Sequence, residues 1–152
     1  MYFMDVIRKL KDNKIKIFVD MDGVIADYDV GNPSRYDIKR PLISNITKLE
    51  KVAKIERVEL FILSVSRKNV GIEEKNIWLD KNAPFFKKEN RVIIAREAND
   101  FQSAKRLKAN FFQQLKREDC KYILIDDDPA VLKEIMETSE DIMLLKDTVL
   151  VD

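Results

Sequence analysis

The chain contains no histidine, one cysteine and three glycines among its 152 residues. Without histidine, Ser-His-Asp and Cys-His catalysis and His-based zinc sites are excluded. Acid–base chemistry must therefore use carboxylates, lysine, tyrosine or the single thiol. Three glycines do not supply a dinucleotide-binding G-x-G-x-x-G or a G-x-x-x-x-G-K phosphate loop. Cys120 has no second cysteine to pair with, which indicates a reducing compartment.

Excess charge and long apolar runs are also absent. Lys plus Arg number 28 and Asp plus Glu 27, so the net charge is +1. We therefore expect no general attraction for nucleic acid or a membrane surface. No apolar run approaches the ~18 residues needed to span a bilayer, and the N-terminus is too charged for a signal peptide. The length and apolar content predict one domain covering residues 1–152. The lone cysteine and the lack of a signal peptide or spanning segment predict a cytoplasmic location.

Short apolar runs alternate with longer segments of helical periodicity along the chain. The expected strands are 14–19, 57–63, 91–95, 121–125 and 141–145, and the expected helices are 5–12, 42–54, 72–81, 101–117 and 129–138. This alternation predicts an α/β fold, a three-layer αβα sandwich with a five-stranded parallel sheet and a Rossmann-like order. Residues 28–41 fit neither pattern and are expected to form a short flap.

Acidic side chains follow two of the expected strands. Asp20 and Asp22 end the first strand, Asp126 and Asp127 end the fourth, and Ser64 follows the second. Ligands of parallel sheets bind beyond the carboxyl ends of the strands. Carboxylates crowded there would repel one another unless a cation lay between them, and oxygen ligands alone favour Mg²⁺. Nearby Ser, Lys and Arg donors suit a phosphate group.

Simpler interpretations compete for several of these residues. A D-x-D sequence after a strand can be a plain turn, although the second acidic strand end makes this less favourable. Asp128 before Pro129 is better explained as a helix N-cap than as a ligand. Trp78 and the Phe-Phe pairs at 85–86 and 111–112 are assigned to the core rather than to base stacking, and Cys120 to packing.

Three segments resemble motifs of the haloacid dehalogenase superfamily of Mg²⁺-dependent phosphotransferases. "FVDMDGVIAD" matches the first motif, "LFILS" is similar to the second, and "YILIDDDP" is similar to the fourth. The three lie in the family's order over roughly residues 15 to 130. Within the superfamily, "VDMDGVIAD", "LIDDDP" and the weaker match "WLDKNAP" look closest to the 5'(3')-deoxyribonucleotidase-like branch.

The resemblance implies a role for each matching residue. Asp20 would be the nucleophile and a Mg²⁺ ligand, and Asp22 the general acid–base that also binds the metal through its backbone carbonyl. Ser64 would donate a hydrogen bond to the transferred phosphoryl group. Asp126 and Asp127 would complete the metal site, either of them directly or through water.

The family's third motif is a lysine that neutralises the nucleophile and the phosphate. Lys108, in "KANFF", is the first choice because "KA" followed by aromatics recurs in this branch, and Lys105 is the second. The family's cap domains, often inserted between the first two motifs, have only the flap 28–41 as a counterpart here. The nucleotide pocket of the deoxyribonucleotidases is therefore not evident in the sequence.

The sequence predicts a Mg²⁺-dependent phosphomonoester hydrolase that forms an aspartyl-phosphate, with a phosphorylated small molecule as substrate and a nucleotide as one candidate. Two alternatives stay open. One is a phosphatase of a phosphorylated macromolecule, either a nucleic-acid end or a protein. The other is a binding module that keeps the fold without activity. The oligomeric state and the physiological substrate do not follow from the sequence.

Overall fold

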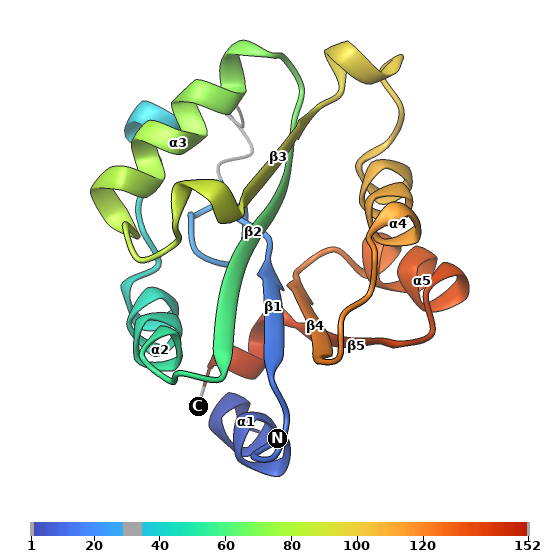
Figure 1. The fold of residues 1–152 in the computed structure, drawn as a ribbon. Coiled ribbons are helices and arrows are strands. Elements are labelled where there is room, and N and C mark those ends of the chain that lie inside the picture. Colours follow the sequence, from blue (N-terminus) through green and yellow to red (C-terminus); the bar gives the residue numbers. More distant parts are fainter. Residues whose placement is uncertain (1, 29–34, 152) are drawn as a thin grey trace.

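A parallel sheet forms the centre of the protein. The computed structural model describes residues 2–28 and 35–151. The strands are β1 (Ile15–Val19), β2 (Val58–Ser66), β3 (Arg91–Ala95), β4 (Lys121–Asp126) and β5 (Ile142–Lys146), in the order β3-β2-β1-β4-β5. All four pairings are parallel. The first and fourth motif strands are therefore neighbours at the centre, and β2 lies on the other side of β1 (Figure 1).

Helices cover both faces of the sheet, as the alternating pattern predicts. The helices α1 (Phe3–Lys9), α2 (Ile43–Ala53) and α3 (Val70–Asn82) pack on one face, and α4 (Ala104–Gln114) and α5 (Pro129–Thr138) on the other (Figure 1). Strand β1 shows the side-chain alternation behind this arrangement: Ile17 and Val19 belong to the first core, whereas Phe18 belongs to the second. The predicted αβα sandwich is confirmed.

Short 3-10 turns complete the connections between these elements. They are η1 (Tyr36–Ile38), η2 (Lys88–Asn90), η3 (Glu97–Asn99) and η4 (Asp147–Leu150). The described residues between β1 and β2 form only η1 and α2, so no cap domain is seen in that described part. The predicted flap 28–41 is described at residue 28 and from residue 35 onward, and its segment 29–34 lies outside the described residues. No helix in 2–28 or 35–151 combines the length and apolar character needed to cross a bilayer.

Two of the elements that differ in extent from the sequence prediction bear on the site. Strand β2 continues to Ser66 instead of ending at residue 63, because its last residues pair with β3, Ser64 opposite Ile93. Helix α4 begins at residue 104 instead of 101, since Asp100 and Phe101 both have φ of +52°, which a helix does not accommodate. Ser64 therefore lies within its strand and not beyond it.

Both Asp128 and the aromatic residues follow their simpler interpretations. The Asp128 side chain accepts a hydrogen bond from the backbone N–H of Ala130 at 2.9 Å, which makes it the N-cap of α5, with a proline in the first turn. Trp78, Phe86 and Phe112 are buried in the two cores, and Phe85 and Phe111 pack against them. Cys120 is partly buried beside the second core, as expected of a packing residue.

Candidate active site

A tight turn after β1 presents the D-x-D pair. The carbonyl of Met21 accepts hydrogen bonds from the three backbone N–H groups of residues 24–26, at 3.0–3.1 Å. Gly23 has φ of +82°, a conformation that residues with a side chain rarely adopt. Asp20 remains tied to β4 through its N–H, which donates to the carbonyl of Ile125 at 3.0 Å. The turn thus holds the D-x-D pair directly beside the end of β4.

Three carboxylates converge where β1 and β4 end. One oxygen atom each from Asp20, Asp126 and Asp127 lies within 4.8 Å of the others. Oxygens that share one Mg²⁺ are roughly 3 to 4 Å apart, given metal–oxygen distances of ~2.1 Å. A small contraction would therefore let these three residues hold the ion. The donor set contains hard oxygen atoms alone, which fits Mg²⁺.

Gly23 shapes this cluster as well as the turn. A Cβ atom built on Gly23 would lie 2.1 Å from Oδ2 of Asp127. The missing side chain therefore leaves the space that the Asp127 carboxylate occupies. The turn after β1 and the Asp127 carboxylate are therefore packed directly against each other.

The pKa values of Asp126 and Asp127, at the end of β4, are both raised. Burial, reinforced by the charge of Asp20, raises the pKa of Asp126 to about 6 even though Lys108 acts in the opposite direction. Burial and the charges of Asp20 and Asp126 raise the pKa of Asp127 to about 7. A divalent cation between these groups would relieve the repulsion, so the electrostatics also favour metal binding.

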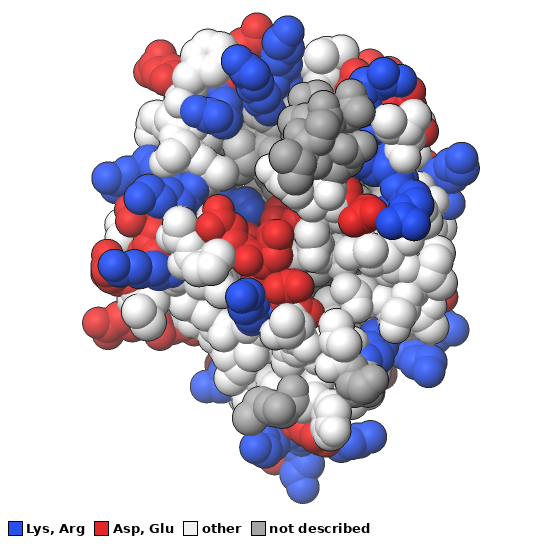
Figure 2. Space-filling model, turned by 180° about the vertical axis from the view of Figure 1, so that it is seen from behind, with Lys and Arg blue, Asp and Glu red and all other residues white. Residues whose placement is uncertain are grey.

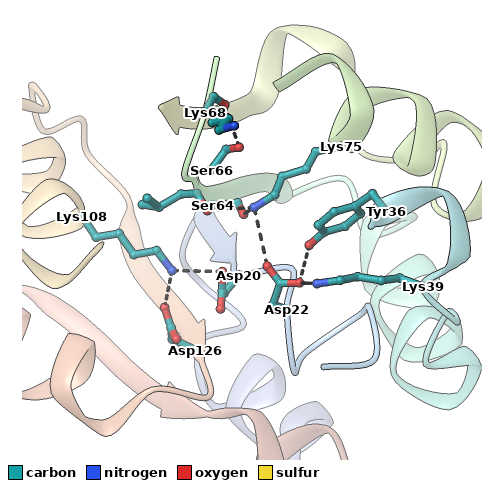
Figure 3. Close-up of polar contacts among 11 residues, drawn as sticks. Asp20, Asp22, Tyr36, Lys39, Ser64, Ser66, Lys68, Lys75, Lys108 and Asp126 are labelled. Atoms are coloured by element: carbon teal, nitrogen blue, oxygen red, sulfur yellow. Dashed lines mark hydrogen bonds and ion pairs between the residues drawn. The ribbon is translucent and has the colours of Figure 1, made fainter. Parts of the chain in front are cut away.

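Lys108 of α4 lies between the two acidic strand ends. Its Nζ atom is 2.7 Å from Oδ2 of Asp126 and 3.0 Å from Oδ1 of Asp20 (Figure 3). The lysine side chain is only 4 % exposed, and although burial lowers its pKa, the two carboxylates outweigh burial and raise it. Lys108 is therefore a fixed positive charge beside Asp20. Lys105, one turn earlier on the same helix, is exposed.

Three residues that the sequence analysis did not single out contact the Asp22 carboxylate. Tyr36 donates a hydrogen bond to Oδ1 of Asp22 at 2.6 Å, and Lys39 contacts the same oxygen. Lys75 Nζ lies 3.6 Å from Oδ2 (Figure 3). Burial raises the pKa of Asp22, but Lys75, Lys39 and Tyr36 together outweigh it and lower the pKa. Asp22 is therefore a carboxylate in the resting site.

Tyr36 and Lys39 belong to the described part of the flap, which is anchored to the rest of the fold. The indole N–H of Trp78 donates to the carbonyl of Lys39 at 3.0 Å, and the N–H of Asp27 donates to the carbonyl of Arg40 at 2.8 Å. Trp78 and Tyr36 also meet edge to face, with ring centroids 6.0 Å apart. These contacts fix both flap side chains against Asp22.

Lys75 also contacts Ser64. Its Nζ atom donates to Oγ of Ser64 at 2.7 Å and to the carbonyl of Val65 at 2.9 Å. Ser64 is fully buried, and burial lowers the pKa of Lys75 although Asp22 and Asp20 oppose this. A sequence signal for Lys75 existed: it lies three and four residues before the buried Trp78 and Leu79, on the inner face of α3. A charged residue on a buried helical face is a functional candidate.

A cavity of about 430 Å³ opens over this cluster. Its lining residues include the five aspartates Asp20, Asp22, Asp126, Asp127 and Asp128 together with Lys108, Tyr28, Val65 and Ala104. Figure 2 shows acidic side chains gathered on this face of the molecule. The structure thus brings together Asp20, Asp22, Asp126, Asp127 and Lys108 around one cavity, whereas the buried Ser64 and its partner Lys75 are not among the lining residues. Lys105 is not among the residues that line it.

Comparisons with known proteins give structural matches only. No protein-family model matches the chain, and no curated protein matches its sequence. A chain from the structure of the Pnkp1/Rnl/Hen1 complex is 17 % identical over 88 % of this chain and 46 % of that chain, with a TM-score of 0.67. A chain of the Pnkp1/Rnl/Hen1 RNA repair complex is 18 % identical over 89 % and 43 %, with a TM-score of 0.66. This chain therefore spans less than half the length of both.

A third match, the HAD domain of the effector protein Lem4 from Legionella pneumophila, is 14 % identical over 88 % of this chain and 85 % of that chain, with a TM-score of 0.49. At such identities the likenesses concern the fold, and they do not single out a nucleotidase branch. The chain therefore shares the fold of the two Pnkp1/Rnl/Hen1 chains, and its parallel αβα sandwich is the fold that the resemblance to the haloacid dehalogenase superfamily implies.

Proposed function

We propose that this protein is a Mg²⁺-dependent phosphomonoester hydrolase that works through an aspartyl-phosphate on Asp20. The observation that carries the proposal is the position of the Asp20 carboxylate. It lies against the buried ammonium of Lys108 on one side and the Asp126–Asp127 pair on the other. A carboxylate so placed is oriented and next to positive charge that can offset a phosphoryl group.

Four aspartates would hold the cation. Asp20, Asp126 and Asp127 would bind Mg²⁺ through their side chains, directly or through water, and Asp22 through its backbone carbonyl. When bound, the ion supplies charge neutralisation at the phosphoryl oxygens. Lys108 adds a second positive charge at the same place. Ser64, the residue that the resemblance assigns to the phosphoryl group, accepts a hydrogen bond from Lys75.

The reaction has two steps on these residues. A carboxylate oxygen of Asp20 attacks phosphorus in line, the bond from phosphorus to the leaving oxygen breaks, and Asp22 gives that oxygen a proton. Water then attacks the phosphorus of the aspartyl-phosphate and gives a proton to Asp22. The bond between phosphorus and Asp20 breaks, which releases orthophosphate and restores both aspartates.

Asp22 needs a proton before the first step because its two lysines and Tyr36 keep it ionised at rest. A phosphate monoester has a second pKa of about 6, so a fraction of the substrate carries a proton near neutral pH. The negative charge of the bound phosphoryl group also raises the proton affinity of Asp22. Transfer of that proton to Asp22 on binding would prepare the acid.

The end of a phosphorylated nucleic acid is a second candidate substrate beside a free nucleotide. Two structural neighbours are chains of the Pnkp1/Rnl/Hen1 complex, in one case named an RNA repair complex. In addition, η1 and α2 are the elements described between β1 and β2, which leaves the region near Asp22 without a large cap. An open site of this kind suits a bulky leaving group.

Turnover of a phosphomonoester panel tests the proposal. The panel contains an aryl phosphate, mononucleotides, phosphopeptides and oligonucleotides with a 5'- or 3'-phosphate, each assayed with and without Mg²⁺. We expect Mg²⁺-dependent release of orthophosphate from at least one member, and a phosphorylated protein trapped by acid quenching. Asp20→Asn should abolish both while the circular dichroism spectrum stays unchanged. Substantial turnover by a folded Asp20→Asn protein would refute the mechanism, and Mg²⁺ binding without any turnover would favour the binding module.

A further inference from the structure

The superfamily resemblance implies that Ser64 donates a hydrogen bond to the phosphoryl group, but in the structure Ser64 is buried and accepts a hydrogen bond from Lys75. Ser64 is 0 % exposed, so its hydroxyl does not face the cavity, and it accepts a hydrogen bond from Lys75 at 2.7 Å. The Lys75 side chain keeps 5 % of its surface exposed. Neither residue is among those that line the cavity, but Nζ of Lys75 lies 3.6 Å from Oδ2 of Asp22, which does line it. Of the two residues, the lysine is therefore the one beside a cavity-lining carboxylate.

The ammonium group of Lys75 has three hydrogens, and the structure accounts for two of them. One is donated to Oγ of Ser64 and one to the carbonyl of Val65, at 2.7 and 2.9 Å. These two acceptors belong to β2, so they fix the nitrogen against the rigid sheet. The third hydrogen is left on the side of Asp22, whose Oδ2 atom is 3.6 Å away, too far for a hydrogen bond.

The remaining hydrogen of Lys75 is on the side of Asp22 and of the Tyr36 ring, whose centroid is 5.2 Å from Nζ. The carbonyl that accepts from Lys75 belongs to Val65, and Val65 lines the cavity together with Asp20 and Asp22. Although burial lowers the pKa of Lys75, the charges of Asp22 and Asp20 act in the opposite direction. Lys108 contacts Asp20 from α4, and Lys75 comes from α3, so the two lysines approach the D-x-D pair from different sides (Figure 3). A phosphoryl group on Asp20 would lie between two ammonium groups.

We propose that Lys75 donates the hydrogen bond to the transferred phosphoryl group that the resemblance gives to Ser64, and that Ser64 is a positioning residue for Lys75. The proposal rests on the phosphohydrolase function above. In this arrangement Lys75, and not Ser64, contacts an oxygen of the phosphoryl group. Ser64 acts through it by fixing the ammonium against β2.

Binding of orthophosphate in the presence of Mg²⁺ tests this assignment without requiring turnover. The variants are Lys75→Met, Ser64→Ala and the double variant, with Lys81→Met as the matched control because Lys81 is exposed on the same helix. Lys75→Met should weaken orthophosphate binding roughly ten- to hundred-fold, the usual effect of losing a charged hydrogen bond. Ser64→Ala should weaken it less, and it should add nothing once Lys75 is methionine. Lys81→Met should bind as the wild type does.

Two further variants separate a phosphate contact from a structural role. In an Asp22→Asn background the side chain at position 22 carries no charge. Lys75→Met should still weaken orthophosphate binding there by a factor similar to the one in the wild-type background. If that loss disappears, Lys75 acts only by holding Asp22 and the proposal fails. Lys75→Arg keeps the charge and should retain more orthophosphate affinity than Lys75→Met. Should Lys75→Met not fold, Lys75→Gln replaces it in every comparison.

The result that overturns the assignment is a further several-fold loss from Ser64→Ala in the Lys75→Met background, or unchanged binding by Lys75→Met. Steady-state kinetics on an active substrate add a second criterion: Lys75→Met should raise KM and lower kcat together, whereas Lys81→Met should change neither. A wild-type protein that binds orthophosphate but hydrolyses no phosphomonoester would refute the proposed function. The comparison of Lys75 with Ser64 would still be decided by the binding data.

Discussion

The Asp127 carboxylate fills the space that a side chain at position 23 would need: a Cβ atom built on Gly23 would lie 2.1 Å from Oδ2 of Asp127. The φ angle of Gly23 is +82°. The glycine of the D-x-D-G sequence is thus required twice, once by the backbone of its own turn and once by a carboxylate from β4. The turn after β1 and the acids after β4 therefore fit together as one unit.

Gly23→Ala should displace the Asp127 carboxylate and weaken Mg²⁺ binding. The positive φ adds strain of about 1–3 kcal/mol, so we also expect a lower Tm without metal. The measurement is the rise in Tm on addition of Mg²⁺, compared between the variant and the wild type. Adding Asp127→Ala to Gly23→Ala removes the clash and should restore part of the lost stability. An unchanged Mg²⁺ effect in Gly23→Ala would contradict the role given to this contact.

Mg²⁺ binding should weaken as the pH falls. The raised pKa values of Asp126 and Asp127, about 6 and about 7, mean that both carboxyls take up protons as the pH drops below 7. Those protons must leave before the metal binds. Titration calorimetry between about pH 8 and about pH 5.5 should show lower affinity and more proton release at the acidic end. Asp127→Asn should remove the higher of the two transitions, and an affinity independent of pH would count against the metal site.

Lys108→Met should destabilise the protein when Mg²⁺ is absent. The variant leaves the buried Asp20 and Asp126 without their shared cation, and breaking a buried ion pair costs about 3–5 kcal/mol. Mg²⁺ should recover part of this loss because it supplies positive charge at the same carboxylates. Denaturant unfolding with and without Mg²⁺ measures both effects. Lys105→Met is the control: Lys105 is exposed on the same helix, so its loss should change neither stability nor turnover.

Tyr36→Phe should shift the pH dependence of turnover. The Tyr36 hydroxyl donates to the Asp22 carboxylate at 2.6 Å, and such a hydrogen bond lowers the pKa of the acceptor. Without it, the pKa of Asp22 rises, so the limb of the pH–rate profile that reports Asp22 should move to higher pH. Tyr2→Phe, at an exposed tyrosine, provides the control. If Tyr36→Phe and the wild type have identical profiles, the hydrogen bond from Tyr36 does not influence the acid–base chemistry of Asp22.

The sequence was sufficient to predict which acidic residues would meet. A strand that ends in Asp20-x-Asp22 and another that ends in Asp126-Asp127 are brought to one edge once both strands are parallel members of the same sheet. Parallel pairing follows from the helices between the strands, which the hydrophobic periodicity reveals. These acids are therefore placed by backbone topology alone, and β1 and β4 prove to be adjacent.

The basic half of the site was decided by tertiary packing. The positive φ values at residues 100 and 101 delay the start of α4 to residue 104, so Lys105 lies exposed in its first turn. Lys108, one turn later, is buried against Asp20 and Asp126. Lys75 and Lys39 reach Asp22 because α3 and η1 pack together over the end of β1. The long lysine side chains meet their partners at distances set by helix rotation and flap anchoring. Sequence periodicity determines which strand end carries an acid, but only the packed structure determines which ammonium group lies within hydrogen-bonding distance of it.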